Sequence, residues 1–192
     1  VLLLMLNNKD KARRVKMKKY VVILSVVFVV IAVVAAYDGH PEETTVIPYE
    51  SVIRHMPWAG GGDVRYHITI HKPYKKWATW IGKGKMYKGK EPHGAFLTTY
   101  VNEMALDSIN KAQGMADRSI IVKENYDNNK QLTAITVMYK IKGYNPDSGD
   151  WFWAKYDPKF NILAEGKVKD CLDCHGTVKD NDYIFTGKVM GK

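Results

Sequence analysis

The feature that most constrains this chain is the segment CLDCH, residues 171–175. It holds both cysteines of the sequence, Cys171 and Cys174, and a histidine, His175, follows the second one directly. On a single helical turn, two cysteines with this spacing can both form thioethers with the vinyl groups of one haem, and the next histidine then faces the iron. The spacing is therefore that of a c-type haem attachment site, with both cysteines binding the haem and His175 ligating its iron.

Two other chemistries use cysteines with this spacing, and neither fits the rest of the sequence. A structural zinc site needs four ligands, but the sequence has no second cysteine pair. The remaining histidines stand at no ligand spacing from the motif: His40, His55, His67, His71 and His93. A dithiol redox motif normally lies near the start of a βαβ unit, a pattern that the sequence does not show. The sequence therefore favours one covalent haem c, with its iron, per chain.

A basic and then strongly apolar region precedes the rest of the chain. Residues 1–20 carry seven lysines and arginines against one aspartate, so most of the formal net charge of +9 lies there, which argues against a nucleic-acid partner. The uncharged run 20–37, about 27 Å long as a helix, is just long enough to cross a bilayer. It fits a signal peptide cleaved after Ala36, and it also fits a retained membrane anchor behind the basic region 1–19. In both cases residues 38–192 are expected on the periplasmic side, and translation is expected to start at Val1 or Met17.

Residues 38–63 indicate a polar linker or N-terminal arm, and residues 64–192 one haem domain with strand character. β-Branched and aromatic residues predict strands over residues 64–70, 95–101, 119–124, 132–142 and 151–156. Residues 102–112 predict a helix with Asn102 as its N-cap, and residues 143–150 predict a turn between antiparallel strands. A last helix is expected around the cysteine motif. The expected fold class is α+β, an antiparallel, sheet-dominated domain with a few helices and one covalent haem, preceded by a transmembrane or signal helix within residues 1–37.

Several segments together resemble the cytochrome P-460 family and the related cytochromes c′-β. They are YVN (100–102), SIIVKEN (119–125), GDWFWAKY (149–156), CLDCH (171–175) and DYIFT (182–186). They occur in the order of the family and at about its spacing, from residue 92 onwards. Apart from the haem motif no segment is specific by itself, and the resemblance depends on all of them together. It implies the sheet-dominated haem domain of that family, with a five-coordinate iron.

The resemblance makes Lys123 important, because P-460 cytochromes join a lysine at this position through its amine to a porphyrin meso carbon. Strand alternation places Lys123 on one face with Ile121, and Glu124 on the other. Hydroxylamine-oxidising members carry a distal carboxylate approximately where this chain has Met138, and residues 128–146 contain neither Asp nor Glu. Met138 is therefore the candidate for the distal position. A second departure is Arg118, where relatives often have glycine.

The activity that the resemblance implies is the oxidation of hydroxylamine or nitric oxide, with the electrons passing to a redox partner cytochrome. The alternative is a c′-β-like protein that binds nitric oxide with little turnover, which needs no distal proton acceptor. A simple electron carrier would use a second axial ligand, commonly methionine, and no methionine of this chain stands in a diagnostic setting. The resemblance also implies a homodimer. The membrane is a further partner if the run 20–37 is not cleaved.

Overall fold

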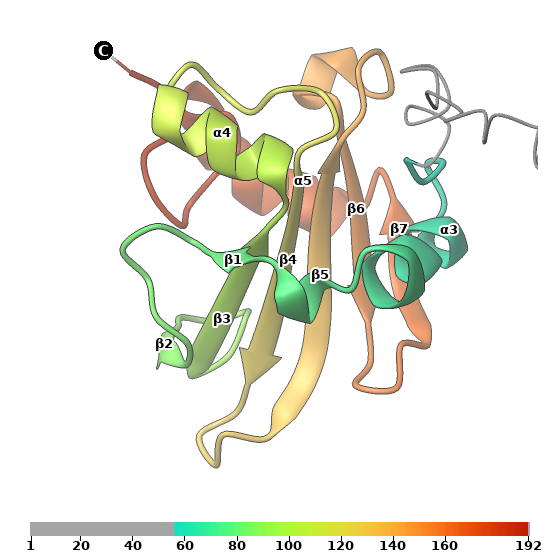
Figure 1. Cartoon of the computed structure of the whole chain (residues 1–192), viewed down its shortest axis with the longest axis vertical. Helices are drawn as coiled ribbons and strands as arrows, with labels where there is room; N and C mark the ends of the chain where they lie inside the picture. The colour runs from blue at the N-terminus through green and yellow to red at the C-terminus, as the bar shows by residue number, and fades with distance from the viewer. Residues whose placement is uncertain (1–55, 192) are drawn as a thin grey trace, which may run out of the picture. The chain divides into compact units, whose positions relative to one another are not determined.

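An antiparallel sheet forms the centre of the structure, a computed structural model that describes residues 56–191 (Figure 1). Within these residues the sheet has seven strands in the order β1-β3-β4-β5-β6-β7, and β2 also pairs with β3. The strands are β1 (Ala78–Thr79), β2 (Tyr87–Lys88), β3 (Phe96–Val101), β4 (Ile120–Tyr126), β5 (Leu132–Lys140), β6 (Trp151–Tyr156) and β7 (Ile162–Gly166). Every strand pairing is antiparallel, which confirms the predicted sheet-dominated fold class.

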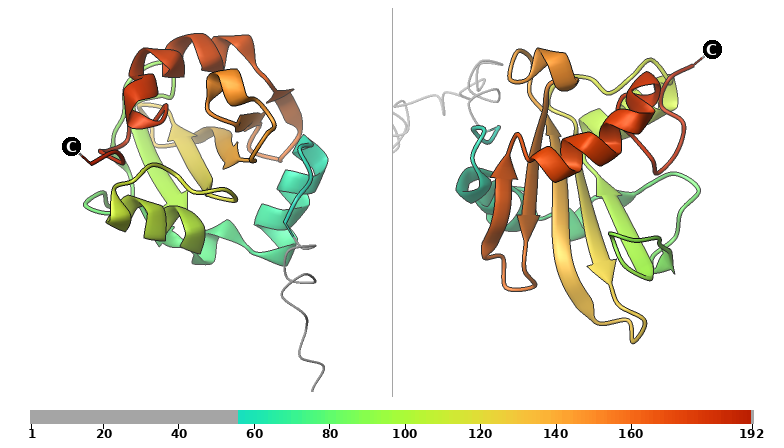
Figure 2. Two further views of the ribbon diagram at one scale, coloured as in Figure 1. Left: turned by 90° about the horizontal axis from the view of Figure 1, so that it is seen from above. Right: turned by 180° about the vertical axis from the view of Figure 1, so that it is seen from behind.

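Short helices connect and cover these strands. The α-helices are α3 (Gly61–Tyr66), α4 (Glu103–Lys111) and α5 (Lys169–His175). One turn of π-helix, η1 (His67–His71), continues α3, and short 3₁₀ helices are η2 (Tyr74–Lys76), η3 (Pro146–Ser148) and η4 (Gly176–Asn181). Seen from behind the view of Figure 1, α5 crosses one face of the sheet, and α3 lies towards the opposite face (Figure 2). The cysteine motif is therefore mounted on a helix that packs across the sheet.

Local signals in the sequence account for several of these elements. Asn102 caps α4 as predicted, because its Oδ1 accepts the Ala105 backbone N–H (2.9 Å), and the same oxygen accepts the Ile120 N–H at the start of β4 (3.0 Å). The segment 143–150 joins the antiparallel strands β5 and β6, and its 3₁₀ turn begins at a proline. The helix expected around the cysteine motif is α5.

The strand predicted over residues 64–70 is wrong, since these residues form α3 and η1. Val64 and Ile68 are both fully buried, whereas Tyr66 is 61% and Ile70 65% exposed. An apolar residue at every second position suggests a strand, but here only the pair four residues apart faces the core, which is the spacing of one helical face. Strand β7, at the far edge of the sheet, was not predicted.

The two faces of the sheet carry separate cores. On one face, Val64 and Ile68 pack with Ile120, Val122 and Ile135. On the other face, α4 and the segment after α5 pack against a second group that includes Trp80, Val101, Ile121, Met138, Trp151, Trp153, Ile184 and Val189. The strand alternation predicted for β4 is thus confirmed, because Ile120 and Val122 lie in the first core and Ile121 in the second.

The N-terminal predictions lie outside the described part of the chain. This holds for the basic region 1–19, for the apolar run 20–37 and for residues 38–55 of the predicted arm. Within residues 56–191, no helix has the length and apolar character needed to cross a membrane. The described helix α3 begins at Gly61, close to the predicted start of the domain at residue 64.

Candidate haem-binding site

Helix α5 presents the CLDCH motif to the second core. Cys171 is half-buried, Cys174 is exposed, and the two thiols are not joined in a disulfide. His175, at the last position of the helix, is buried. Its ring centre lies 4.6 Å from that of Trp153 on β6 and 5.2 Å from that of Phe185. The helix therefore offers two free thiols on its surface and one histidine packed between aromatic rings.

The imidazole of His175 has a fixed orientation. Its Nδ1 lies 2.7 Å from the backbone carbonyl oxygen of Tyr183, and because a carbonyl oxygen can only accept, Nδ1 carries the proton and donates. Burial lowers the pKa of His175, with the charge of Lys123 acting in the same direction, so the ring is neutral near pH 7. Nε2 then keeps its lone pair. A histidine whose Nδ1–H is held by a carbonyl is the usual form of a metal-ligating imidazole.

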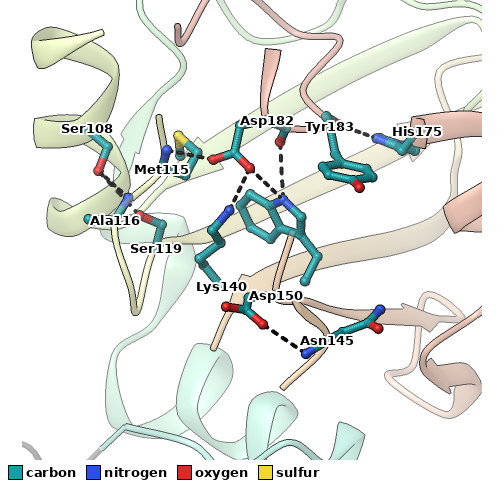
Figure 3. Close-up of polar contacts among 11 residues, drawn as sticks. Ser108, Met115, Ala116, Ser119, Lys140, Asn145, Asp150, His175, Asp182 and Tyr183 are labelled. Atoms are coloured by element: carbon teal, nitrogen blue, oxygen red, sulfur yellow. Dashed lines mark hydrogen bonds and ion pairs between the residues drawn. The ribbon is translucent and has the colours of Figure 1, made fainter. Parts of the chain in front are cut away.

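The carbonyl that orients His175 belongs to a segment that Asp182 ties to the sheet (Figure 3). One carboxylate oxygen of Asp182 accepts from Lys140 Nζ (2.6 Å), and the other accepts the Met115 backbone N–H (2.7 Å). The indole N–H of Trp151 donates to the backbone oxygen of Asp182 (3.1 Å) and also approaches its carboxylate (3.3 Å). These contacts come from three separate parts of the chain. They hold the next residue, Tyr183, in place and through it the ring of His175.

A cavity of about 730 Å³ lies beside the motif. Helix α5 contributes Cys171, Cys174 and His175 to its wall, and the sheet contributes residues of β4, β5, β6 and β7. The loop before β3, which includes His93, forms a further part of the wall. This volume is in the range of cofactor and small-molecule pockets.

Lys123 faces this cavity from the middle of the sheet. It pairs in register with Thr99 on β3 and with Thr136 on β5, and only 9% of the residue is exposed. Burial lowers its pKa to about 8, although a nearby Cys174 acts in the opposite direction. About one amine in ten is then neutral at pH 7, compared with fewer than about one in a thousand for an ordinary lysine. The structure thus brings the candidate cross-linking lysine and the haem motif to the same cavity.

Met138, the candidate for the distal position, also lines the cavity. It lies on β5 between Ile121 of β4 and Trp153 of β6, and 8% of it is exposed. Carboxylates do reach the wall, but from other segments: Glu91, Asp127 and Asp170. The carboxylate of Asp127 accepts backbone N–H groups of the β4–β5 turn, from Asn129 and Gln131.

Two cavity residues escaped the sequence analysis, His93 and Asn125. His93 was set aside because it stands far from the motif in the sequence, yet its ring centre lies 6.1 Å from that of His175. Its Nδ1 donates to Oδ1 of the buried Asn125 (3.1 Å). Burial lowers the pKa of His93 to about 4, together with the charges of Lys123 and His175. The sequence signal that could have identified His93 is its position in PHGAF. This segment leads into a predicted strand that lies beside the predicted strand of Lys123.

The cavity residues fit a covalently bound haem. Two unpaired thiols and a neutral imidazole with a free Nε2 stand on one helix at the cavity wall. The indole nitrogen of Trp153, another wall residue, is buried and has no hydrogen-bond partner among the described residues, so a group in the cavity could satisfy it. Within residues 56–191 no cluster of three or more His, Cys, Asp or Glu side chains could hold a bare metal ion. A haem brings the four porphyrin nitrogens with its iron and needs only His175 from the helix.

The comparison with known proteins agrees with this geometry. The family model described as Cytochrome P460 matches residues 71–186, which include Lys123, Met138, the whole CLDCH motif and Asp182. A search of curated proteins found no match to the chain. The matched span is more than half of the sequence and contains every sheet strand of the described structure. The chain therefore belongs to the cytochrome P460 family and is a haem-binding cytochrome.

Proposed function

We propose that this protein is a mono-haem c-type cytochrome that binds and oxidises small nitrogen species, hydroxylamine or nitric oxide, and passes the electrons to an external acceptor. The observation that carries the proposal is that the CLDCH helix and a buried lysine of lowered pKa face one cavity. When bound, the haem supplies an iron that takes up the nitrogen of the guest and exchanges electrons with it. The remaining steps depend on residues of the chain.

The chain holds and orients the haem through α5. Cys171 and Cys174 would each form one thioether, and His175 would ligate the iron through Nε2. The hydrogen bond from His175 Nδ1 to the Tyr183 carbonyl fixes the rotation of the ring and increases the basicity of Nε2. The sheet strands line the cavity beside this helix.

Lys123 would form a third covalent bond, from its amine to a porphyrin meso carbon. The link replaces one N–H and one C–H bond by an N–C bond with loss of two protons and two electrons, so an oxidant such as a peroxide is required. The neutral amine is the nucleophile, and the burial that lowers the pKa of Lys123 increases its share.

Mass spectrometry of haem-bearing peptides from the matured protein tests the proposal. We expect peptides 119–130 and 169–179 to be joined through the same haem, and Lys123→Arg to release the first while the thioethers remain. A free Lys123 peptide in the wild-type protein would contradict the enzyme proposal. A colourless matured protein would contradict the haem as well.

A specific observation supports the second candidate, a c′-β-like protein that binds nitric oxide with little turnover. The apolar, largely buried Met138 lies on the cavity wall near the position where hydroxylamine-oxidising relatives are expected to carry a carboxylate. Without that proton acceptor, bound hydroxylamine loses its protons slowly, whereas a neutral diatomic has no proton to lose. Hydroxylamine turnover with an artificial electron acceptor separates the two. The oxidase proposal predicts steady turnover, and the binding proposal predicts a nitric oxide spectrum without it.

The cellular setting is part of the same proposal. Covalent haem attachment requires export, so the haem domain would act on the periplasmic side, either free after cleavage near Ala36 or anchored through residues 20–37. The electron acceptor would be a redox partner cytochrome, and the protein would form a homodimer. Fractionation of cells tests the location, the mass of the purified protein in solution tests the cleavage and the homodimer, and reduction of a candidate partner cytochrome by the protein tests the acceptor.

A further inference from the structure

We propose that His93 is the second axial ligand of the haem iron at rest, on the side opposite His175, and that a guest molecule displaces it. The inference rests on the haem of the proposed function. It differs in the sixth coordination position of the iron, which would be occupied by a side chain of the protein instead of being vacant. It requires three features of the chain: a suitable ring separation, a free nitrogen on each ring, and a His93 that is held in place.

The separation of the two rings matches two ligands of one metal. Metal–imidazole nitrogen bonds are about 2.1 Å long, and a ring centre lies roughly 1.1 Å behind its nitrogen, so two opposed ligands have ring centres about 6.4 Å apart. The observed distance between the centres of His93 and His175 is 6.1 Å, with the ring planes at 83°. Two imidazoles that bind opposite sides of one metal keep their bonds at any angle between their planes, so the observed 83° is compatible with this arrangement.

The same distance is too short for a guest between the iron and His93. A diatomic bound to the iron and hydrogen-bonded to His93 would add one bond and one contact of about 2.8 Å, which places the ring centres roughly 8 to 9 Å apart. His93 in its observed position would thus ligate the iron rather than hydrogen-bond to a guest. A guest must move it away.

Each ring directs Nε2 away from its orienting partner. His175 donates from Nδ1 to the Tyr183 carbonyl. His93 donates from Nδ1 to Oδ1 of Asn125, and the assignment of that oxygen is supported because Nδ2 of Asn125 already donates to the backbone oxygens of Lys123 (3.2 Å) and Ala134 (3.1 Å). Both histidines line the cavity, and both keep the lone pair of Nε2. Such an outer-shell hydrogen bond is the usual support of a metal-ligating histidine.

The loop that carries His93 is fixed to β4. Gly94 has a φ of +100°, and a Cβ at this position would lie 2.6 Å from the backbone oxygen of Tyr126. Only glycine allows this close approach at a positive φ. Together with the Asn125 hydrogen bond, the contact with β4 holds His93 at the cavity.

The test uses the matured ferric haem protein without added ligand. Visible absorption and electron paramagnetic resonance spectra of the wild type should show a six-coordinate, low-spin iron, with the anisotropic signal expected for nearly perpendicular histidine planes. His93→Ala should convert it to high spin, and added imidazole should restore the low-spin spectrum. Cyanide should bind the His93→Ala protein at least tenfold faster than the wild type. His71→Ala, a histidine outside the cavity, should change none of these.

A wild-type spectrum that is already high-spin and unchanged by His93→Ala would overturn the inference and leave the proposed function intact, since the iron would then be open. A protein without haem would instead contradict the proposed function. If His93→Ala does not mature, Asn125→Leu keeps the ligand and removes its orienting partner. We then expect a mixture of low-spin and high-spin iron, and a fully high-spin wild type would again refute the inference.

Discussion

Replacing Glu124 should destabilise the protein strongly, although its side chain does not line the haem cavity. Glu124 follows Lys123 on β4 and points into the opposite core, where it is 1% exposed. Its carboxylate accepts from the hydroxyl of Tyr74 (2.8 Å), from the hydroxyl of Tyr126 (2.7 Å) and from the ammonium of Lys75. This cluster fixes the strand that presents Lys123 to the cavity.

The magnitude follows from what each partner loses in Glu124→Ala. The hydroxyls of Tyr74 and Tyr126 lose their acceptor, at about 1–3 kcal/mol each. Lys75 is 59% exposed and turns to water, so its loss adds little. We expect about 3–5 kcal/mol less free energy of unfolding. Glu124→Gln keeps the shape, and its amide can accept from one tyrosine and donate to the other, so we expect about 1–2 kcal/mol.

The pH dependence separates charge from shape. Burial raises the pKa of Glu124, but the hydrogen bonds from Lys75, Tyr126 and Tyr74 outweigh it and lower the pKa overall. A carboxylate with a lowered folded-state pKa stabilises the fold above its unfolded value, about 4.3, and this stabilisation is lost as pH falls through the folded value. The difference between wild type and Glu124→Gln should therefore stay constant from about pH 5 to 7 and shrink below about pH 4.

Urea unfolding of the haem protein, followed by tryptophan fluorescence, measures these changes. Glu103→Gln on the exposed first turn of α4 is the matched control and should cost at most about 1 kcal/mol, from the helix dipole. A loss below 1 kcal/mol for Glu124→Ala would refute the reasoning. So would a Glu124→Gln difference that does not change down to pH 3.

Three further predictions follow from the site. The yield of the Lys123–haem link under peroxide should rise with pH through about 8, because the neutral amine is the nucleophile, and peptide mass spectrometry at each pH measures it. Asp182→Ala removes the carboxylate that accepts from Lys140 and from the Met115 backbone N–H, so we expect about 2–4 kcal/mol lower stability by urea unfolding and a shifted haem potential, with a smaller effect for Asp182→Asn. Arg118 has a φ of +69°, where glycine is unstrained. Arg118→Gly relieves this strain but increases the entropy of the unfolded chain, so we expect a net gain of about 0.5–1 kcal/mol in the free energy of unfolding, measured as a higher thermal midpoint.

Local patterns predicted most of the strands and the motif helix. Strand alternation in SIIVKEN placed Lys123 and Glu124 on opposite faces, and the structure confirms this. The sequence could predict it because the side chains of an extended strand alternate whatever the distant contacts are. The helix at CLDCH and the Asn102 cap were predictable for the same reason. Arg118 was noted only as a departure from the glycine that the family resemblance leads one to expect, and its φ is one that glycine adopts without strain.

The remainder depends on contacts between distant segments. Alternation at residues 64–70 could not show which apolar residues face the core. Only Val64 and Ile68 are buried, and their spacing of four residues is that of one helical face. His93 was dismissed by its distance along the sequence, yet the β3–β4 pairing places its loop beside Lys123 and Asn125. Spacing along the sequence can identify ligands only when they lie on the same helix or strand. It says nothing of a ligand carried by another wall of the cavity.

The supports of the two histidines differ, and this predicts which one a guest displaces. His175 is the last residue of α5, and its orienting carbonyl belongs to a segment that Asp182 ties to β5 and β6 through Lys140 and Trp151. If His175 moves alone it loses its hydrogen bond to that carbonyl, and if the carbonyl moves with it the Lys140–Asp182 ion pair and the Trp151 hydrogen bond break as well. His93 is held by one side-chain hydrogen bond and by the packing of a short loop against β4. Releasing it costs far less, at about 0.5–1.5 kcal/mol for a hydrogen bond between neutral groups. A guest that binds the iron can offset that amount, so the His93 side should open while His175 stays bound.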